Sequence, residues 1–383
     1  MTVKDSMTVE ATLAQLVSID STSSRSNGAI VEFALARAVA AGMRARVTSY
    51  RDERGTEKFQ MLAFAPSETE EVELALVGHT DTVPFDAAWT EALTLTEREG
   101  NLYARGACDT KGFIAAALTA IEETDVRALR RPLALVLTAD EEVGLVGAKR
   151  LAESKPFRAR HAVVGEPTSL QPMRAGKGYC LAGVTVRGRE GHSAYPDLGA
   201  SAIMRAARLV TRVEEMAEEL KRDGHDSFDP PQTTVNVGLI AGGTAKNIIA
   251  GECRFTLEWR PVPGQRPEHV AELLAREVEA LRAEDEGFDC AVRVQRLDQG
   301  IETNADAPLV RALEELTGKE SGTISFATEA PQMAELGADA VVFGPGDIRV
   351  AHRTGEFVPA SELKEAVAIL RGVIERFCVA EHQ

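Results

Sequence analysis

The sequence predicts an α/β protein in which a mostly parallel sheet is covered by helices on both faces and carries an inserted α+β domain. Near-continuous apolar runs such as Pro132–Thr138, which suit strands buried on both faces, alternate with helical patterns such as Phe113–Glu122. From residue 177 to 297 the pattern changes to strands that alternate polar and apolar residues. The length of 383 residues, 44% of them hydrophobic, favours two domains over one.

The first predicted domain comprises residues 1–176 and resumes at residues 298–383. Its helices repeat apolar residues at intervals of three and four, and its strands are short apolar runs that end at Gly or at polar turns. We expect helices at Val9–Val17, Ile30–Ala41 and Phe113–Glu122, with another ending at Leu151, and extended segments or strands at Arg44–Ser49, 59–65, 73–78, Pro132–Thr138, 162–164 and 340–343.

The second predicted domain, residues 177–297, follows the order β-α-β-β-α-β of a ferredoxin-like unit, with helices over one sheet face. An exposed edge strand or helix pair on this domain could mediate dimerisation, although charged residues can equally block an unpaired edge. We expect strands at Leu181–Arg187, Thr233–Ile240, Glu252–Trp259 and Ala291–Leu297, and helices at Leu198–Leu220 and Arg266–Leu281.

Composition limits the partners and the compartment. The formal net charge of −16 and the pI near 5.1 argue against nucleic acid, which attracts clustered Lys and Arg. The stretch Met1–Met7 lacks the apolar region of a signal peptide, and no apolar run approaches the roughly 18 residues that a membrane span needs. The five cysteines are scattered and contain no Cys-x-x-Cys, so no disulfide framework is predicted. We expect a cytoplasmic protein.

His79 and Asp81 form the first candidate site. They follow the apolar run Leu74–Val77, and because residues i and i+2 of a strand share a face, the two side chains point the same way. A carboxylate beside a histidine commonly orients the ring while the other ring nitrogen holds a cation. A lone His-x-Asp is more often an ordinary polar turn, so a metal site depends on partners elsewhere in the chain.

Further metal-competent side chains follow other predicted strands. Functional groups of a parallel sheet gather beyond the carboxyl ends of its strands, so these side chains should meet at one edge. An acid after a strand is often only a helix N-cap or first-turn residue, which could explain Glu141 and Glu142 separately but not the whole set. The set comprises His79, Glu141, Glu142, Glu166 and His352 after strands, and Asp109 in a loop before a helix.

Histidines and carboxylates without cysteine suit zinc, cobalt or manganese better than copper(I) or an iron–sulfur cluster. One zinc ion needs only three protein ligands, so the surplus of acids predicts two metal ions bridged by one carboxylate. A carboxylate that binds no metal can then take a proton from the attacking water and return it to the leaving amine. The adjacent pair Glu141 and Glu142 offers one residue for each task.

The ordered motifs of the chain resemble those of the M20 family of co-catalytic metallopeptidases and deacylases. The resemblance extends over nearly the whole chain, and it implies that the inserted domain serves as a lid and a dimerisation domain. The motifs are Gly78–Pro84, Gly106–Gly112, Asp140–Glu142, Gly165–Thr168 and Gly191–Ser193.

The resemblance also implies a role for each candidate residue. One metal ion, zinc or cobalt, would be held by His79, Asp109 and Glu166. A second would be held by Asp109, Glu142 and His352, so that Asp109 bridges the two. Glu141 would be the general base, and Asp81 would orient His79.

Two features of the lid complete the implied site. His192 of the partner subunit would stabilise the oxyanion, although the residues alone suggest only a turn. Asn247 and Arg260 match lid positions for the substrate's carbonyl and carboxylate, and a guanidinium fork fits a carboxylate geometrically. A homodimer through the inserted domain is therefore expected.

Segments at 165–172, 328–331 and 344–346 are most similar to family members that remove the acetyl group from N2-acetyl-L-ornithine in arginine biosynthesis. Glu329 would then recognise the cationic side chain of the substrate. Deacetylation of N-acetylcitrulline and desuccinylation of succinyl-diaminopimelate stay open as alternatives. A non-catalytic binding protein is disfavoured, because Glu141 and every metal position are present.

Overall fold

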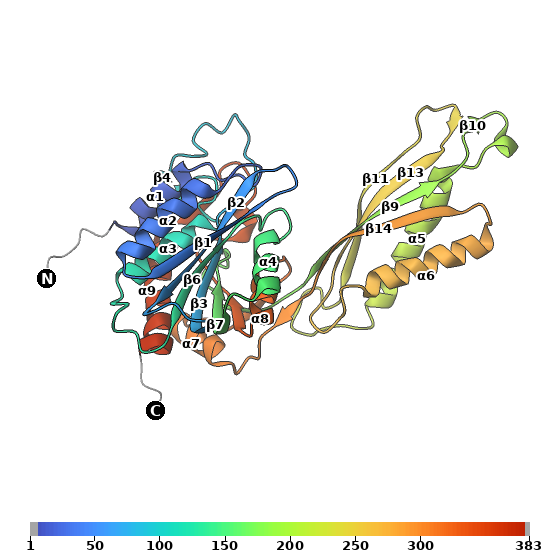
Figure 1. The fold of residues 1–383 in the computed structure, drawn as a ribbon. Helices are drawn as coiled ribbons and strands as arrows, with labels where there is room; N and C mark the ends of the chain where they lie inside the picture. Colours follow the sequence, from blue (N-terminus) through green and yellow to red (C-terminus); the bar gives the residue numbers. More distant parts are fainter. Residues whose placement is uncertain (1–6, 380–383) are drawn as a thin grey trace. The chain divides into compact units, whose positions relative to one another are not determined.

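The computed structural model describes residues 7–379 and divides into two compact units (Figure 1). The first unit comprises the chain up to Arg174, Thr303–Gly322 and the chain from Thr328 on. The second unit comprises Ala175–Glu302 and the short segment Thr323–Ala327. The expectation about a signal peptide concerned residues 1–7, of which 1–6 lie outside the described residues.

The first unit is built on a mixed sheet. Four neighbouring strands, in the order β6, β3, β7, β17, run parallel, whereas β1, β2 and β8 join the edges in antiparallel pairs. The α/β class is confirmed, but the prediction of a mostly parallel sheet is wrong. The strands are β1 (Arg44–Arg51), β2 (Glu57–Ala65), β3 (Glu71–His79), β6 (Leu133–Thr138), β7 (Arg158–Val164), β8 (Met173–Gly176) and β17 (Asp339–Val342).

The antiparallel edge has a simple physical cause. Only residues 52–56 connect β1 to β2, and so short a connection permits a hairpin but no parallel crossover. At the other edge β8 continues into the second unit, where Gly176 and Ala175 pair with β15 (Ile301–Glu302). β16 (Gly322–Ile324) also pairs with β8.

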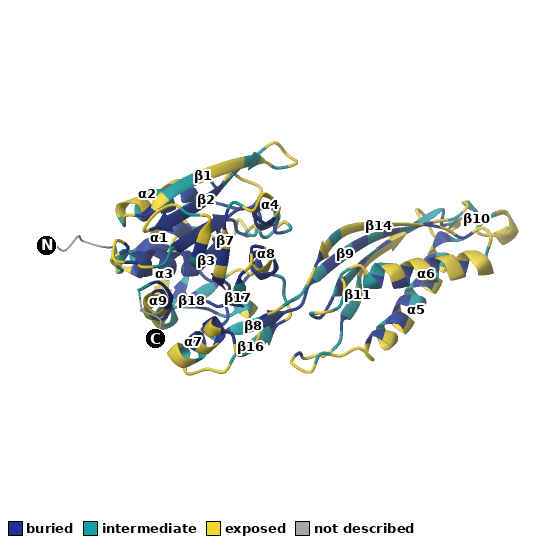
Figure 2. Cartoon of the chain, turned by 60° about the horizontal axis from the view of Figure 1, so that its bottom comes forward, coloured by how far each residue is buried: buried dark blue, intermediate teal, exposed yellow. Residues whose placement is uncertain are grey.

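Helices cover both faces of this sheet. All six residues of β6 are buried, as the sequence predicts for a strand covered on both sides. Figure 2 shows the neighbouring strand β3 mainly in the dark blue of buried residues. Figure 1 shows α1, α2, α3 and α9 on one face and α4 and α8 on the other. The helices are α1 (Val9–Ser18), α2 (Gly28–Ala40), α3 (Lys111–Glu122), α4 (Val146–Ser154), α7 (Pro308–Thr317), α8 (Ala330–Glu335) and α9 (Ala360–Ile374), which continues into a π turn, η3 (Glu375–Val379).

A small antiparallel sheet and one short helix accompany the first unit. The strand β5 (Asn101–Tyr103) lies between β4 (Thr96–Arg98) and β18 (Phe357–Pro359). The pairing of β5 with β18 brings the chain before α3 beside the chain before α9. The 3-10 helix η2 (Ile348–Val350) precedes His352.

The second unit has a four-stranded antiparallel sheet in the order β11, β13, β9, β14, with α5 and α6 on one face. Its strands alternate buried and less buried residues, because one face packs on the helices and the other stays open. The elements are β9 (Tyr179–Arg187), α5 (Ala202–Leu220), β11 (Thr234–Gly242), β13 (Glu252–Arg260), α6 (His269–Glu284) and β14 (Asp289–Asp298), with the short β10 (Gly191–His192), β12 (Ile248–Ile249) and η1 (Pro196–Leu198).

Side-chain hydroxyls cap the N-termini of two of the helices. Thr8 accepts a hydrogen bond from the amide of Ala11 at the start of α1, and Ser201 accepts one from Met204 at the start of α5. No helix within residues 7–379 is long and apolar enough to cross a bilayer.

Candidate metal centre

The four parallel strands of the first unit bring the predicted metal ligands to one edge. Neighbouring parallel strands share the direction of their carboxyl ends, so residues that follow them lie side by side. Asp109 comes from elsewhere, because it precedes α3. His79 is the last residue of β3, Glu141 and Glu142 follow β6, Glu166 follows β7, and His352 lies in the loop after β17.

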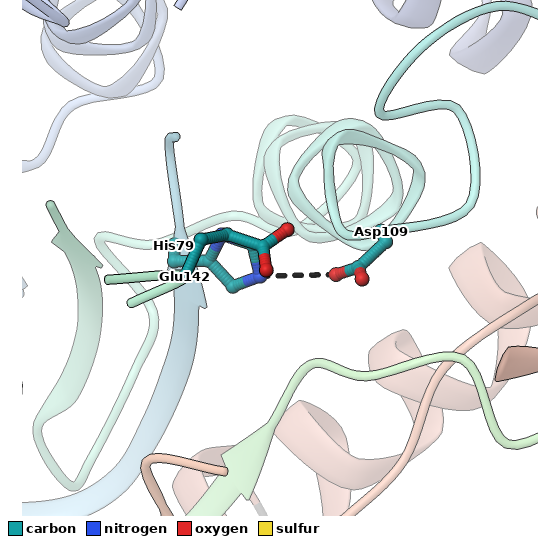
Figure 3. Close-up of side chains that lie close together, drawn as sticks. All are labelled: His79, Asp109 and Glu142. Atoms are coloured by element: carbon teal, nitrogen blue, oxygen red, sulfur yellow. Dashed lines mark hydrogen bonds and ion pairs between the residues drawn. The ribbon is translucent and has the colours of Figure 1, made fainter. Parts of the chain in front are cut away.

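Asp109 lies between the two histidines. Its Oδ1 is 3.0 Å from Nε2 of His79, and its Oδ2 is 3.0 Å from Nε2 of His352. Nε2 of His352 is also 3.1 Å from Oε1 of Glu142. One donor atom from each of His79, Asp109 and Glu142 lies within 4.8 Å of the others (Figure 3). The two oxygens of Asp109 are therefore placed as a bridging carboxylate would be.

Asp81 contacts His79, the turn after β6 and Ser23. Nδ1 of His79 is 2.9 Å from the carbonyl oxygen of Asp81 and 3.6 Å from its Oδ1. The carboxylate of Asp81 accepts hydrogen bonds from the amides of Glu141 and Glu142, at 3.1 and 3.3 Å. It also accepts one from the hydroxyl of Ser23, at 2.8 Å. Asp81 thus ties the end of β3 to the turn after β6.

Burial raises the pKa of the three glutamates in the cluster and neighbouring carboxylates raise it further, whereas hydrogen bonds with His352 and His79 outweigh burial at Asp109 and lower its pKa. Burial and the charges of Asp109 and Glu141 raise the pKa of Glu166 well above its ordinary value. Burial, with Glu142 and Asp109, does the same for the pKa of Glu141. Negative charge is therefore crowded at this edge, and a divalent cation is the group that would stabilise the ionised carboxylates.

The pKa of both histidines is raised, as expected for rings beside carboxylates. Hydrogen bonds with Asp109 and Glu142 raise the pKa of His352 to about 10. Burial lowers the pKa of His79, but hydrogen bonds with Asp109 and Asp81 outweigh burial and raise that pKa well above its ordinary value. A ring that attracts a proton this strongly is equally placed to bind a metal ion, which takes the proton's position. Imidazole and carboxylate donors without a thiolate fit zinc, cobalt or manganese.

Two buried ion pairs support the cluster, and sequence reasoning missed both. Glu356 accepts hydrogen bonds from the amides of Cys108 and Asp109, at 3.0 and 3.1 Å, and pairs with Arg105. Lys58 pairs with Asp140, the residue before Glu141, at 2.8 Å. Lys58 stands at the start of β2, near the polar residues Glu57 and Gln60, so no local pattern distinguishes it, and none distinguishes Glu356.

Glu329 is buried beside the end of β6. It is 1% exposed, and its carboxylate accepts a hydrogen bond from the hydroxyl of Thr138, the last residue of β6. Burial raises its pKa to about 7. This position does not favour the prediction that Glu329 recognises a cationic substrate group, which stays a prediction.

The remaining candidate residues lie in the second unit. His192 is exposed and lies on β10, which pairs with β12. The backbone carbonyl of Asn247 accepts a hydrogen bond from the amide of Ser193 at 3.1 Å. Arg260 ends β13, with Nε 2.8 Å from Glu258 and Nη1 2.8 Å from the carbonyl of Ser325. The guanidinium also lies over the ring of Tyr179, 4.8 Å from its centre.

Known proteins resemble this chain over almost its full length. The model of Peptidase family M20/M25/M40 matches residues 75–376. An acetylornithine deacetylase of Myxococcus xanthus is 56% identical over 372 residues, 97% of each chain, and one of Proteus mirabilis is 35% identical over 365 residues, 94% of this chain and 93% of that one.

Two solved structures share the fold. A tripeptidase from Staphylococcus aureus has TM-score 0.77 at 23% identity over 96% of this chain and 97% of that one, and a Sulfolobus solfataricus M20 family metallo-carboxypeptidase has TM-score 0.76 at 19% identity over 97% and 99%.

Proposed function

The chain belongs to Peptidase family M20/M25/M40, and from that premise we propose that it removes the acetyl group from N2-acetyl-L-ornithine to give L-ornithine and acetate. It is a hydrolase that acts on amides. The observation that carries the proposal is the cluster around Asp109: both histidines contact Asp109, and a carboxylate oxygen of Glu142 lies within 4.8 Å of it. The identity of 56% to an acetylornithine deacetylase supports the choice of substrate.

The family is metal-dependent, and the donor atoms of this site fit a divalent cation. We infer two ions, zinc or cobalt, one held by His79, Asp109 and Glu166. The other would be held by Asp109, Glu142 and His352. When bound, such ions supply Lewis acidity that activates water and polarises the substrate carbonyl.

Glu141 is the residue best placed to move the proton. Its amide donates a hydrogen bond to the carboxylate of Asp81, which holds the turn that carries the side chain of Glu141. Burial raises the pKa of its carboxyl group, which therefore accepts a proton from water more readily than an exposed glutamate does. The same proton is then available to the amine that leaves. Asp81 contributes by holding the ring of His79.

Arg260 and Asn247 supply recognition in this proposal, Arg260 for the substrate carboxylate and Asn247 for the carbonyl. Arg260 is the last residue of β13, whereas Asn247 lies in the connection from β11 that leads to its first residue, and the nine residues of β13 extend about 26 Å. One acylated amino acid cannot span that distance. Both residues can therefore serve one substrate only if they come from different copies of the chain.

We infer a homodimer with the second unit as a lid and dimerisation domain, and the separation of Arg260 from Asn247 supports it. His192 lies beside Asn247 at the same end of β13, so His192 of the partner subunit would stabilise the oxyanion. Leu239 and Ile240, on the edge strand β11, are 72% and 56% exposed, which suits burial against a second copy. No nucleic acid or membrane partner is proposed.

We infer a cytoplasmic location and a place in arginine biosynthesis. All five cysteines are free and buried, which fits a reducing compartment.

The test is the rate of amide hydrolysis by zinc- or cobalt-loaded protein on N2-acetyl-L-ornithine, N-acetylcitrulline and succinyl-diaminopimelate, with chelated protein as control. A clear preference for acetylornithine supports the proposal. Chelator-sensitive activity on another of the three would keep the mechanism and overturn the substrate. No activity on any of them would favour a non-catalytic binding protein.

A further inference from the structure

Lys58 is a buried cation that the mechanism above does not use. It lies on β2, and its side chain is 1% exposed. Its Nζ donates to the carbonyl oxygens of Ser23, at 2.6 Å, and Arg25, at 2.8 Å. The same atom lies 2.8 Å from Oδ1 of Asp140. One ammonium group therefore joins the chain after α1 to the turn after β6.

The first connection leads to Asp81. While the carbonyl of Ser23 accepts from Lys58, its hydroxyl donates to Oδ2 of Asp81 at 2.8 Å and contacts the carbonyl of Thr82 at 3.1 Å. Ser23 is buried, so water does not compete for these bonds. The position of Asp81, which in turn holds the ring of His79, depends on a loop that Lys58 anchors.

The second connection leads to the acidic turn. Asp140 immediately precedes Glu141 and Glu142, is 1% exposed, and has the left-handed φ of 58° that non-glycine residues rarely adopt. The hydroxyl of Tyr50 donates to its Oδ2 at 2.9 Å, so Lys58 and Tyr50 each contact one oxygen of the carboxylate. These two contacts hold the backbone that carries Glu141 and Glu142.

Both connections meet again at Asp81, because its carboxylate accepts the amides of Glu141 and Glu142. We propose that Lys58 is a positioning residue of the active site: it fixes Asp81 through Ser23 and the acidic turn through Asp140, so that His79, Glu141 and Glu142 keep their mutual geometry. The inference rests on the proposed function only in giving these residues their roles. A lysine whose role was only to neutralise Asp140 would not need the contacts with Ser23.

The test is Lys58→Met, which keeps the length of the side chain and removes the ammonium. We expect weaker cobalt binding in a chelator competition and, at saturating cobalt, a kcat on N2-acetyl-L-ornithine about 10- to 100-fold below the wild type, a size typical for residues that orient metal ligands. KM should change little, because Lys58 touches no substrate. Cobalt affinity and kcat both equal to those of the wild type would overturn the proposal.

Arg37→Met is the matched control. Arg37 and Glu122 form an ion pair between α2 and α3 with side chains 13% and 14% exposed, and neither contacts the metal centre. This variant should lower the melting temperature and leave cobalt affinity and kcat unchanged. If Arg37→Met loses as much activity as Lys58→Met, general loosening explains both and the proposal fails.

Ser23→Ala decides the matter if Lys58→Met does not fold. It keeps the backbone carbonyl of residue 23, which accepts a hydrogen bond from Lys58, and removes only the hydroxyl that donates to Asp81. Cobalt affinity and kcat should both fall, but by less than in Lys58→Met. If both stay equal to those of the wild type, the proposal is wrong. Cobalt affinity is informative even if wild-type protein does not hydrolyse acetylornithine, so failure of the proposed function can be distinguished from failure of this inference.

Discussion

The two units differ in how they hold most of their candidate residues, although His352 of the first unit is exposed. In the first, His79 is 1% exposed and the carboxylate of Asp81 accepts hydrogen bonds from three separate donors. In the second, His192 and Asn247 are exposed and lie by two-residue strands. Groups that bear on bond breaking need preorganisation, whereas groups that must receive a substrate have to stay accessible. The difference predicts which substitutions change metal binding and which change only turnover or recognition.

The largest effect is expected at Glu141 of the first unit. Glu141→Gln keeps the shape of the side chain and removes the proton acceptor, so kcat should fall by about 10²- to 10⁴-fold, the usual contribution of a general acid–base group. Cobalt content, measured by elemental analysis, should match that of the wild type. Loss of bound metal would mean that the roles of Glu141 and Glu142 are exchanged.

The next effect tests the exposed end of the second unit. His192→Ala removes a donor to the oxyanion, and kcat should fall by about 10²- to 10³-fold, as for other oxyanion donors. Cobalt affinity should not change, because His192 belongs to the second unit. Mixing this variant with inactive Glu141→Gln protein should restore part of the activity if His192 acts across a dimer. Without restoration, His192 does not act in the partner's site.

A third prediction concerns the buried acid Glu329. Its pKa is raised to about 7 in the folded protein, so stability is lost as pH rises through the interval between its unfolded pKa and 7. Glu329→Gln should therefore stabilise the chelated protein above pH 7, by about 3 kcal/mol at most, and have little effect below pH 4.5. Thermal melting across this pH range measures the difference.

The same variant examines the recognition role predicted for Glu329. If it contacts the cationic group of the substrate, Glu329→Gln changes the ratio of kcat/KM between acetylornithine and N-acetylcitrulline. An unchanged ratio together with the stability gain above pH 7 would make Glu329 a buried structural acid only.

The smallest effect is expected at Arg260. Arg260→Lys keeps the charge but loses the planar fork that matches a carboxylate, so KM should rise by about tenfold with little change in kcat. Steady-state kinetics on acetylornithine measures both constants. A fall in kcat with KM unchanged would contradict a role in binding the substrate carboxylate.

The sequence predicted the parts of the molecule that rest on short-range patterns. His79 and Asp81 lie close together, as the pattern predicted, although β3 ends at His79 and Asp81 follows the strand. The rule for parallel strands places Glu141, Glu142 and Glu166 at one edge. The mixed sheet was missed because the antiparallel pairing of β1 with β2 depends on how a short loop closes, not on the apolar pattern of either strand.

The supporting contacts were missed for a related reason. Ser23 and Asp81 are 58 residues apart, and Arg105 and Glu356 are 251 apart. A hydrogen bond between such distant segments leaves no periodic trace in one sequence. The segment Thr323–Ala327, which belongs to the second unit, was likewise not foreseen because it returns after the first unit has resumed.

The most direct test is a cobalt titration of the chelated protein with hydrolysis of N2-acetyl-L-ornithine followed at each step. We expect no hydrolysis without metal, a rise in rate that tracks occupancy of the cluster around Asp109, and saturation at two ions per chain. Hydrolysis by the fully chelated protein, or full occupancy without hydrolysis, would contradict this expectation.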